Sequence, residues 1–91
     1  MKHTTLSTNT QEYRRLRELS IAKSKIQWET IGENDFKASL SDYLFHIKEF
    51  GNDSFSWTVS KGVVVLDDDG VESLEEAKEA CIEAYVHHIL S

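Results

Sequence analysis

The 91-residue chain contains no proline and a single cysteine, Cys81. One cysteine cannot form a disulfide within the chain, and this usage is typical of a reducing compartment. No apolar run approaches the roughly 18–20 residues that a membrane-spanning helix needs, and the first residues lack the charged and then apolar pattern of a secretory leader. We therefore expect a cytoplasmic protein.

Short catalytic motifs are missing as well. The chain contains no Gly-x-Ser-x-Gly nucleophile motif, no Walker-type phosphate loop and no Gly-x-Gly-x-x-Gly fingerprint. Cys81 falls in the middle of an expected helix with Glu79 and Glu83 nearby, and these charges oppose formation of a reactive thiolate. We expect neither an enzyme nor a bound cofactor.

The chain has an excess of negative charge, and its charges are unevenly distributed along the sequence. The chain carries 10 Lys/Arg and 16 Asp/Glu, a formal net charge of −6. Residues 1–25 hold six basic and two acidic residues (+4), whereas residues 26–91 hold four and fourteen (−10). A negative body repels nucleic-acid phosphates and attracts basic partners, or it simply keeps the protein in solution, and the sequence leaves both interpretations open.

Apolar residues in the middle of the chain recur at every second position. Phe55, Trp57 and Val59 alternate with polar residues, which indicates a half-buried strand. Similar runs follow Ile26 and lie at 36–40, 43–48 and 63–66, with short turn sequences between them. Consecutive short connections favour an antiparallel meander of four or five strands over residues 26–66.

Helical patterns flank this region on both sides. The pattern at 10–24 has a thin apolar stripe and a threonine cap at Thr8 or Thr10, while residues 1–8 lack periodicity and are expected to be frayed. At 73–90, Ser73 and Glu76 form a Ser-x-x-Glu capping box before an amphipathic pattern. The predicted fold is one α+β domain over residues 1–91, with the C-terminal helix across one sheet face.

The run Asp67-Asp68-Asp69-Gly70 invites comparison with a calcium-binding loop. Aligning Gly70 with the invariant glycine of an EF-hand puts Val65, which has no ligand oxygen, at the first ligand position. A strand, a turn and a helix cap explain the same residues. We predict an acidic turn and no metal site.

The four histidines do not form a zinc motif. His87 and His88 are adjacent on a helix and therefore point about 100° apart. His46 lies in an expected strand and His3 in the expected frayed start, and no Cys-x-x-Cys or His-Glu-x-x-His accompanies them. We expect His88 to be partly buried beside the sheet and His87 to face solvent.

Basic residues gather in the first predicted helix. They are Arg14, Arg15, Arg17, Lys23 and Lys25. Together with sheet aromatics, such a patch is one way to bind a nucleic acid. The aromatics, however, occupy the alternating positions that a core requires, and the other sheet face is of mixed charge. A nucleic-acid-binding regulator is thus the alternative hypothesis.

The pattern also resembles a group of known proteins. The segments that carry the resemblance are Trp28, Phe36-Lys37-Ala38, Tyr43-Leu44-Phe45-His46-Ile47, Phe55-Ser56-Trp57-Thr58-Val59 and Ser73-Leu74-Glu75-Glu76-Ala77-Lys78. Over residues 26–86 the chain is similar to small uncharacterised β-meander proteins encoded by phages and prophages, which end in a helix of this kind. The resemblance implies a bacterial host cytoplasm and a non-enzymatic accessory role, often the occlusion of a host protein such as a nuclease or a CRISPR complex.

These observations lead to one functional hypothesis. We expect a protein-binding module that engages or inhibits a host protein through an acidic surface. The residues expected to make the contacts, all assigned to turns, are Glu33, Asp35, Asp53, Asp67, Asp68 and Asp69. Self-association through an open sheet edge or the first helix is a third hypothesis.

Overall fold

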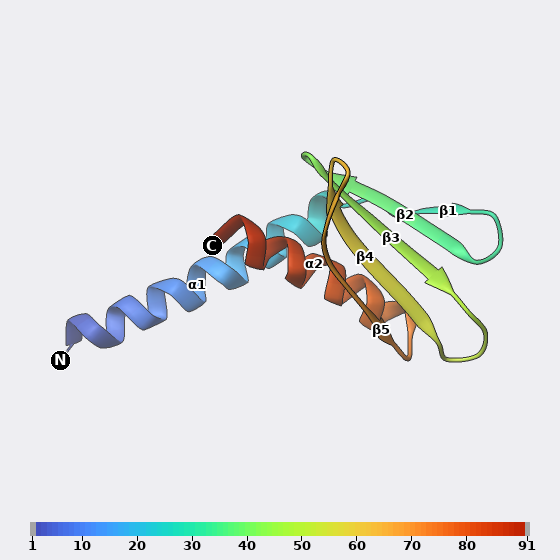
Figure 1. The fold of residues 1–91 in the computed structure, drawn as a ribbon. Helices are drawn as coiled ribbons and strands as arrows, with labels where there is room; N and C mark the ends of the chain where they lie inside the picture. Colours follow the sequence, from blue (N-terminus) through green and yellow to red (C-terminus); the bar gives the residue numbers. More distant parts are fainter. Residues whose placement is uncertain (1, 91) are drawn as a thin grey trace.

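The computed structural model describes the backbone of residues 2–90 and the side chains of residues 12–90. The chain begins and ends with a helix, and five strands lie between the two helices in the sequence (Figure 1). The elements are α1 (Lys2–Lys25), β1 (Glu29–Ile31), β2 (Asp35–Leu40), β3 (Tyr43–Glu49), β4 (Phe55–Lys61), β5 (Val64–Val71) and α2 (Leu74–Leu90). The predicted α+β fold is confirmed.

The strands form one antiparallel sheet in the order β1-β2-β3-β4-β5. Sequence neighbours are therefore spatial neighbours, as short connections require. Ser41 and Asp42 alone separate the paired residues Leu40 and Tyr43, and Ser41 has a φ of 58°. Gly62, with a φ of 64°, begins the equally short connection to β5, since glycine adopts positive φ without a steric cost.

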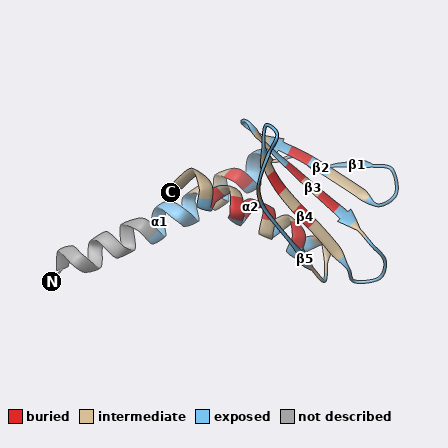
Figure 2. Cartoon of the chain, viewed as in Figure 1, coloured by how far each residue is buried: buried red, intermediate tan, exposed pale blue. Residues whose placement is uncertain are grey.

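The core lies on one face of the sheet, as the two-residue rhythm predicts. In the register Ala38, Phe45 and Val59 stand side by side across β2, β3 and β4. Phe45, Ile47 and Val59 are at most 1% exposed, because α2 covers this face (Figure 2). Burying such side chains contributes about 1.5–3 kcal/mol each.

Helix α2 begins where the capping box predicts. Ser73 Oγ accepts a hydrogen bond from the backbone N–H of Glu76 at 3.1 Å and donates one to Glu76 Oε1 at 3.1 Å. From this start, Ala77 and Cys81, both 0% exposed, face the sheet. Small residues here let the helix approach the aromatic core closely, and Tyr85 meets the ring of Tyr43 edge-on at 4.9 Å.

Helix α1 packs mainly on α2, with Leu40 of β2 at the edge of the contact. Ala22, Ile82 and Val86 form a second buried cluster between the helices. The N-terminal half of α1 projects away from the rest of the fold (Figure 1). Tyr13 and Leu16 are 66% and 57% exposed. None of the described helices is long and apolar enough to cross a membrane.

Three predicted boundaries were wrong. Helix α1 begins at Lys2, so residues 2–8 are helical rather than frayed, and the caps at Thr8 and Thr10 fall inside the helix. Extending an existing helix adds one hydrogen bond per residue and needs no new nucleus. Strand β1 begins at Glu29 instead of Ile26, because the Ile26 N–H still donates to the Ala22 carbonyl at 2.9 Å and prolongs the helical turn.

The third error concerns β5. Asp67-Asp68-Asp69-Gly70 is not a turn but the second half of this strand. Had the chain turned at Asp67, β4 would have lost its pairing partner from Phe55 to Val59. The ladder to β4 thus overrides the low strand propensity of Asp and Gly. Leu66, without a register partner at the irregularity between Val59 and Ser60, packs against the core.

Candidate functional site: the acidic edge strand

Negative charge is concentrated in one continuous segment. Residues 67–83 contain eight Asp/Glu and one lysine, a formal charge of −7. The whole chain has −6, so the remaining residues sum to +1. The segment comprises the second half of β5 and the first half of α2, which pack against each other. The acidity of the protein is therefore a local property of one side of the fold.

The three aspartates alternate between the two faces of the sheet. In the register, Asp67 lies opposite Val59 and Asp69 opposite Trp57, both on the face that α2 covers, whereas Asp68 lies opposite Thr58 on the other face. All three are exposed because β5 is the last strand of the sheet. Charges that point inward at an edge are one means by which proteins discourage further strand pairing.

Two of these carboxylates bind backbone donors of their own strand. Asp67 Oδ1 accepts from the Asp68 N–H at 3.0 Å, and Asp69 Oδ1 accepts from the Gly70 N–H at 2.8 Å. N–H groups along a strand point alternately toward the two sides, so those of Asp68 and Gly70 point the same way, and because both donate to these side chains we assign them to the open edge rather than to β4. The aspartates thus occupy donors that the open edge presents.

The first turn of α2 continues the charge. Glu72, Glu75 and Glu76 are exposed around the helix N-terminus, where the helix dipole stabilises negative charge by about 0.3–1 kcal/mol. We define the acidic edge as Asp67, Asp68, Asp69, Glu72, Glu75 and Glu76. Within the described part of the chain, no salt bridge joins any of these six to a basic residue.

The acidic residues farther along α2 are engaged elsewhere. Glu79 lies 3.3 Å from Lys23 Nζ, and Glu83 lies 3.3 Å from the Arg15 guanidinium. Both pairs are largely exposed, and such pairs contribute about 0–1 kcal/mol. They nevertheless connect α1 to α2 and remove two of the basic residues predicted for nucleic-acid binding.

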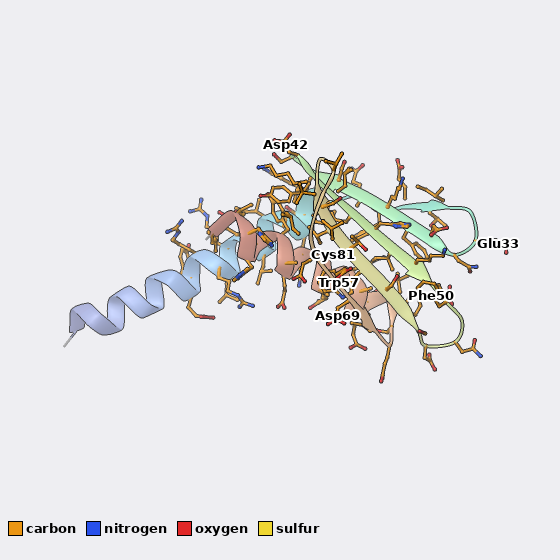
Figure 3. All side chains as sticks on the ribbon, viewed as in Figure 1. Glu33, Asp42, Phe50, Trp57, Asp69 and Cys81 are labelled. Carbon is orange, nitrogen blue, oxygen red and sulfur yellow. The ribbon has the colours of Figure 1, made fainter. Side chains whose placement is uncertain are left out.

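The other three acidic residues predicted from the sequence lie apart from the acidic edge. Glu33 is in the β1–β2 turn and Asp53, with a φ of 58°, is in the β3–β4 turn. Asp35 opens β2 instead of lying in the turn, and its Oδ1 is 3.1 Å from His46 Nε2. Figure 3 shows Glu33 and Asp69 well separated. Sequence reasoning missed Glu72, Glu75 and Glu76 as part of the surface, although the capping box already placed two of them at a helix start.

The remaining basic residues of α1 are not assembled into a groove. Arg14 and Arg17 are exposed on the helix. Lys25 borders a shallow hollow of about 340 Å³ whose other lining residues include Glu29 and Lys37. The core aromatic side chains of the sheet are directed inward, with Phe45 1% and Trp57 7% exposed, whereas Tyr13 on α1 is 66% exposed.

Chemically reactive groups are sparse. Burial raises the pKa of the Cys81 thiol from 9.0 to about 12, so the thiol stays protonated at neutral pH. The rings of His87 and His88 are 5.8 Å apart and nearly perpendicular; His87 is exposed and His88 half-buried, as predicted. Among the side chains of residues 12–90, no three His, Cys, Asp or Glu groups are placed to hold a metal ion.

The site is thus an edge strand and a helix start that share an unpaired negative surface. No protein-family model, no curated protein and no solved structure matches the chain.

Proposed function

We propose that the protein is a non-enzymatic protein-binding module that engages a partner with a basic surface through the acidic edge. The observation that carries this proposal is the set of six carboxylates on β5, at Glu72 and in the first turn of α2 that lack a basic counterpart among the described residues. Complementary charge steers association and selects partners, even where it adds little affinity.

The resemblance to phage- and prophage-encoded proteins supports a more specific version. A small accessory protein of this kind acts in the cytoplasm of a bacterial host and inhibits a host protein, such as a component of a defence complex, by occluding its basic surface. Proteins that handle nucleic acids carry such surfaces, because they bind phosphates through Lys and Arg. The acidic edge then competes with the nucleic acid for the same residues.

A nucleic-acid-binding regulator is the alternative function. Arg14 and Arg17 favour it, since both are exposed on α1. Arg15 and Lys23, in contrast, already contact Glu83 and Glu79. A gel-shift titration at two salt concentrations separates the functions, because binding to phosphates through several basic residues weakens steeply as salt rises.

Affinity capture from bacterial lysate, followed by mass spectrometry, tests the proposal. The informative variant is Asp67→Asn/Asp68→Asn/Asp69→Asn, which removes three charges and keeps the side-chain shape. Its matched control is Glu33→Gln/Asp42→Asn/Asp53→Asn, which removes three charges from exposed turns. Asparagine suits the positive φ of Asp53.

We expect the wild-type chain and the control to capture the same basic partner, and the β5 variant to lose it. Equal capture by the β5 variant and the wild type would contradict the proposal. Equal loss in both variants would show that net charge, and not the acidic edge, determines binding, and would also contradict it.

A further inference from the structure

The longer of the two open sheet edges belongs to β5. Strand β1 has three residues and β5 has eight, and each pairs with a single neighbour. An open edge presents a row of N–H and C=O groups to any extended chain that approaches it. Several recognition domains bind peptides in this way, with main-chain hydrogen bonds providing affinity and alternate side chains providing specificity.

At β5 this row is not free. The outward N–H groups of Asp68 and Gly70 already donate to Asp67 Oδ1 and Asp69 Oδ1, at 3.0 and 2.8 Å. An incoming strand must replace these bonds. A lysine or arginine that pairs with the two carboxylates offers them a stronger interaction than a neutral N–H, because charge-assisted bonds are roughly twice as strong.

A second copy of the chain is the wrong occupant for this edge. Pairing two β5 strands along their length in the antiparallel sense sets the two aspartate runs against each other, and like charges directly opposite destabilise a ladder. A register shifted onto Val63, Val64 and Val65 avoids the repulsion but pairs only a few residues. The occupant must bring positive charge.

The side-chain environment specifies where that charge belongs. Asp67 and Asp69 lie on the α2 side of β5. On the opposite face, the register sets Leu44, Ser60 and Val65 in one row, and the two apolar members, Val65 and Leu44, are 58% and 52% exposed. Basic side chains on the α2 side match Asp67 and Asp69, and the residues that alternate with them can be apolar where they pass Val65 and Gly70 on the other face.

From these observations we infer that β5 is a strand-addition site for an extended partner segment in which lysine or arginine alternates with apolar residues. In the free protein, Asp67 and Asp69 accept hydrogen bonds from the outward N–H groups of β5. When the partner's cations pair with the two carboxylates, these N–H groups become available to the partner's main chain. This inference rests on the proposed function and specifies how the acidic edge binds.

The test uses a synthetic peptide of about ten alternating lysine and valine residues as the probe. Two further peptides carry backbone N-methyl groups, one on all lysines and the other on all valines. N-methylation removes N–H donors without changing charge. In a strand, the N–H groups of the two residue sets face opposite sides, so only one of the two peptides is blocked toward β5.

We expect one N-methylated peptide to lose at least about tenfold in affinity while the other binds like the parent. Amide hydrogen exchange at Asp68 and Gly70 should slow when the parent peptide binds. On the protein side, Gly70→Pro removes one outward donor from an edge strand, where proline is tolerated, and should weaken the parent peptide about threefold to tenfold.

The possible failures are distinguishable. If both methylated peptides bind like the parent, but Asp67→Asn/Asp68→Asn/Asp69→Asn abolishes binding, charge attraction remains and strand addition is overturned. If that variant binds the parent peptide as tightly as the wild type does, the acidic edge is not the binding surface, and the inference and the proposed function both fail. Absence of binding by the parent peptide also overturns the inference.

Discussion

Trp57 lies directly opposite Asp69 in the β4–β5 register, with both side chains on the face that α2 covers (Figure 3). The indole N–H of Trp57 is buried and has no hydrogen-bond acceptor among the described residues. Asp69 meanwhile accepts from the Gly70 N–H at 2.8 Å. The carboxylate of Asp69 therefore serves the open edge of the sheet and leaves a buried donor beside it unsatisfied.

This arrangement predicts an unusually mild effect of Trp57→Phe. An unsatisfied buried donor costs about 1–3 kcal/mol, so its removal offsets most of the loss from the smaller side chain. We expect the free energy of unfolding to change by less than about 1 kcal/mol. Phe45→Ala, which removes a ring of similar burial without a polar group, should cost about 3–5 kcal/mol. Urea denaturation measures both, and a Trp57→Phe cost in the range of the control would contradict the unsatisfied donor.

Because the Asp67 and Asp69 side chains bind the outward N–H groups of β5, we predict that two double substitutions of these aspartates differ in self-association. Asp67→Ala/Asp69→Ala removes both the charges and the side-chain acceptors, which frees the N–H groups of Asp68 and Gly70. We expect this variant to self-associate at high concentration, since open edges pair with each other. Asp67→Asn/Asp69→Asn keeps a carbonyl acceptor at each position and should associate less. Light scattering after gel filtration measures the difference, and two equally monomeric variants would show that the side-chain bonds do not close the edge.

The sequence alone predicts the structural role of some residues and not of others. The alternation through Phe45 and Val59 and the Ser73 cap are local signals, and they identified the core face and the start of α2. The strand at Asp67–Gly70 was missed because three aspartates and a glycine have low strand propensity by themselves. They are in a strand because they pair with β4, and this is a long-range interaction that local sequence does not encode.

Ion pairs between residues far apart in the sequence could not be predicted from the sequence either. No local pattern predicts that Glu79 and Glu83 form ion pairs with residues of α1. The sequence thus found half of the acidic edge, Asp67 to Asp69. It also grouped with them Glu33, Asp35 and Asp53, which lie elsewhere on the sheet, because a charge pattern carries no distance information.

The contact between the helices predicts a specific sensitivity at Ala22. This residue is 2% exposed and faces Ile82 and Val86. Ala22→Leu overfills the contact and should cost about 1–3 kcal/mol. Ser20→Leu, at an exposed position of the same helix, should change the free energy of unfolding by no more than about 0.5 kcal/mol. Thermal unfolding of the two variants compares them, and equal effects would contradict the packing of α1 on α2.

The buried thiol predicts a loss of stability in alkali. The folded pKa of Cys81 is raised to about 12 from 9.0 in the free thiol. The folded state thus holds its proton more tightly than the unfolded state. Its contribution is complete below pH 9 and is lost as the pH rises toward 12. The difference in unfolding free energy between the wild type and Cys81→Ala should shrink over this range, and a constant difference would contradict the burial of the thiol.

The most direct test of the account is a map of backbone amide chemical shifts while the lysine–valine probe is added to the full chain. If β5 is the strand-addition site, the perturbed amides cluster in residues 64–76, along β5 and the first turn of α2. Shifts gathered along Arg14–Lys25 of α1, or spread over the turns at Glu33 and Asp53, would contradict it.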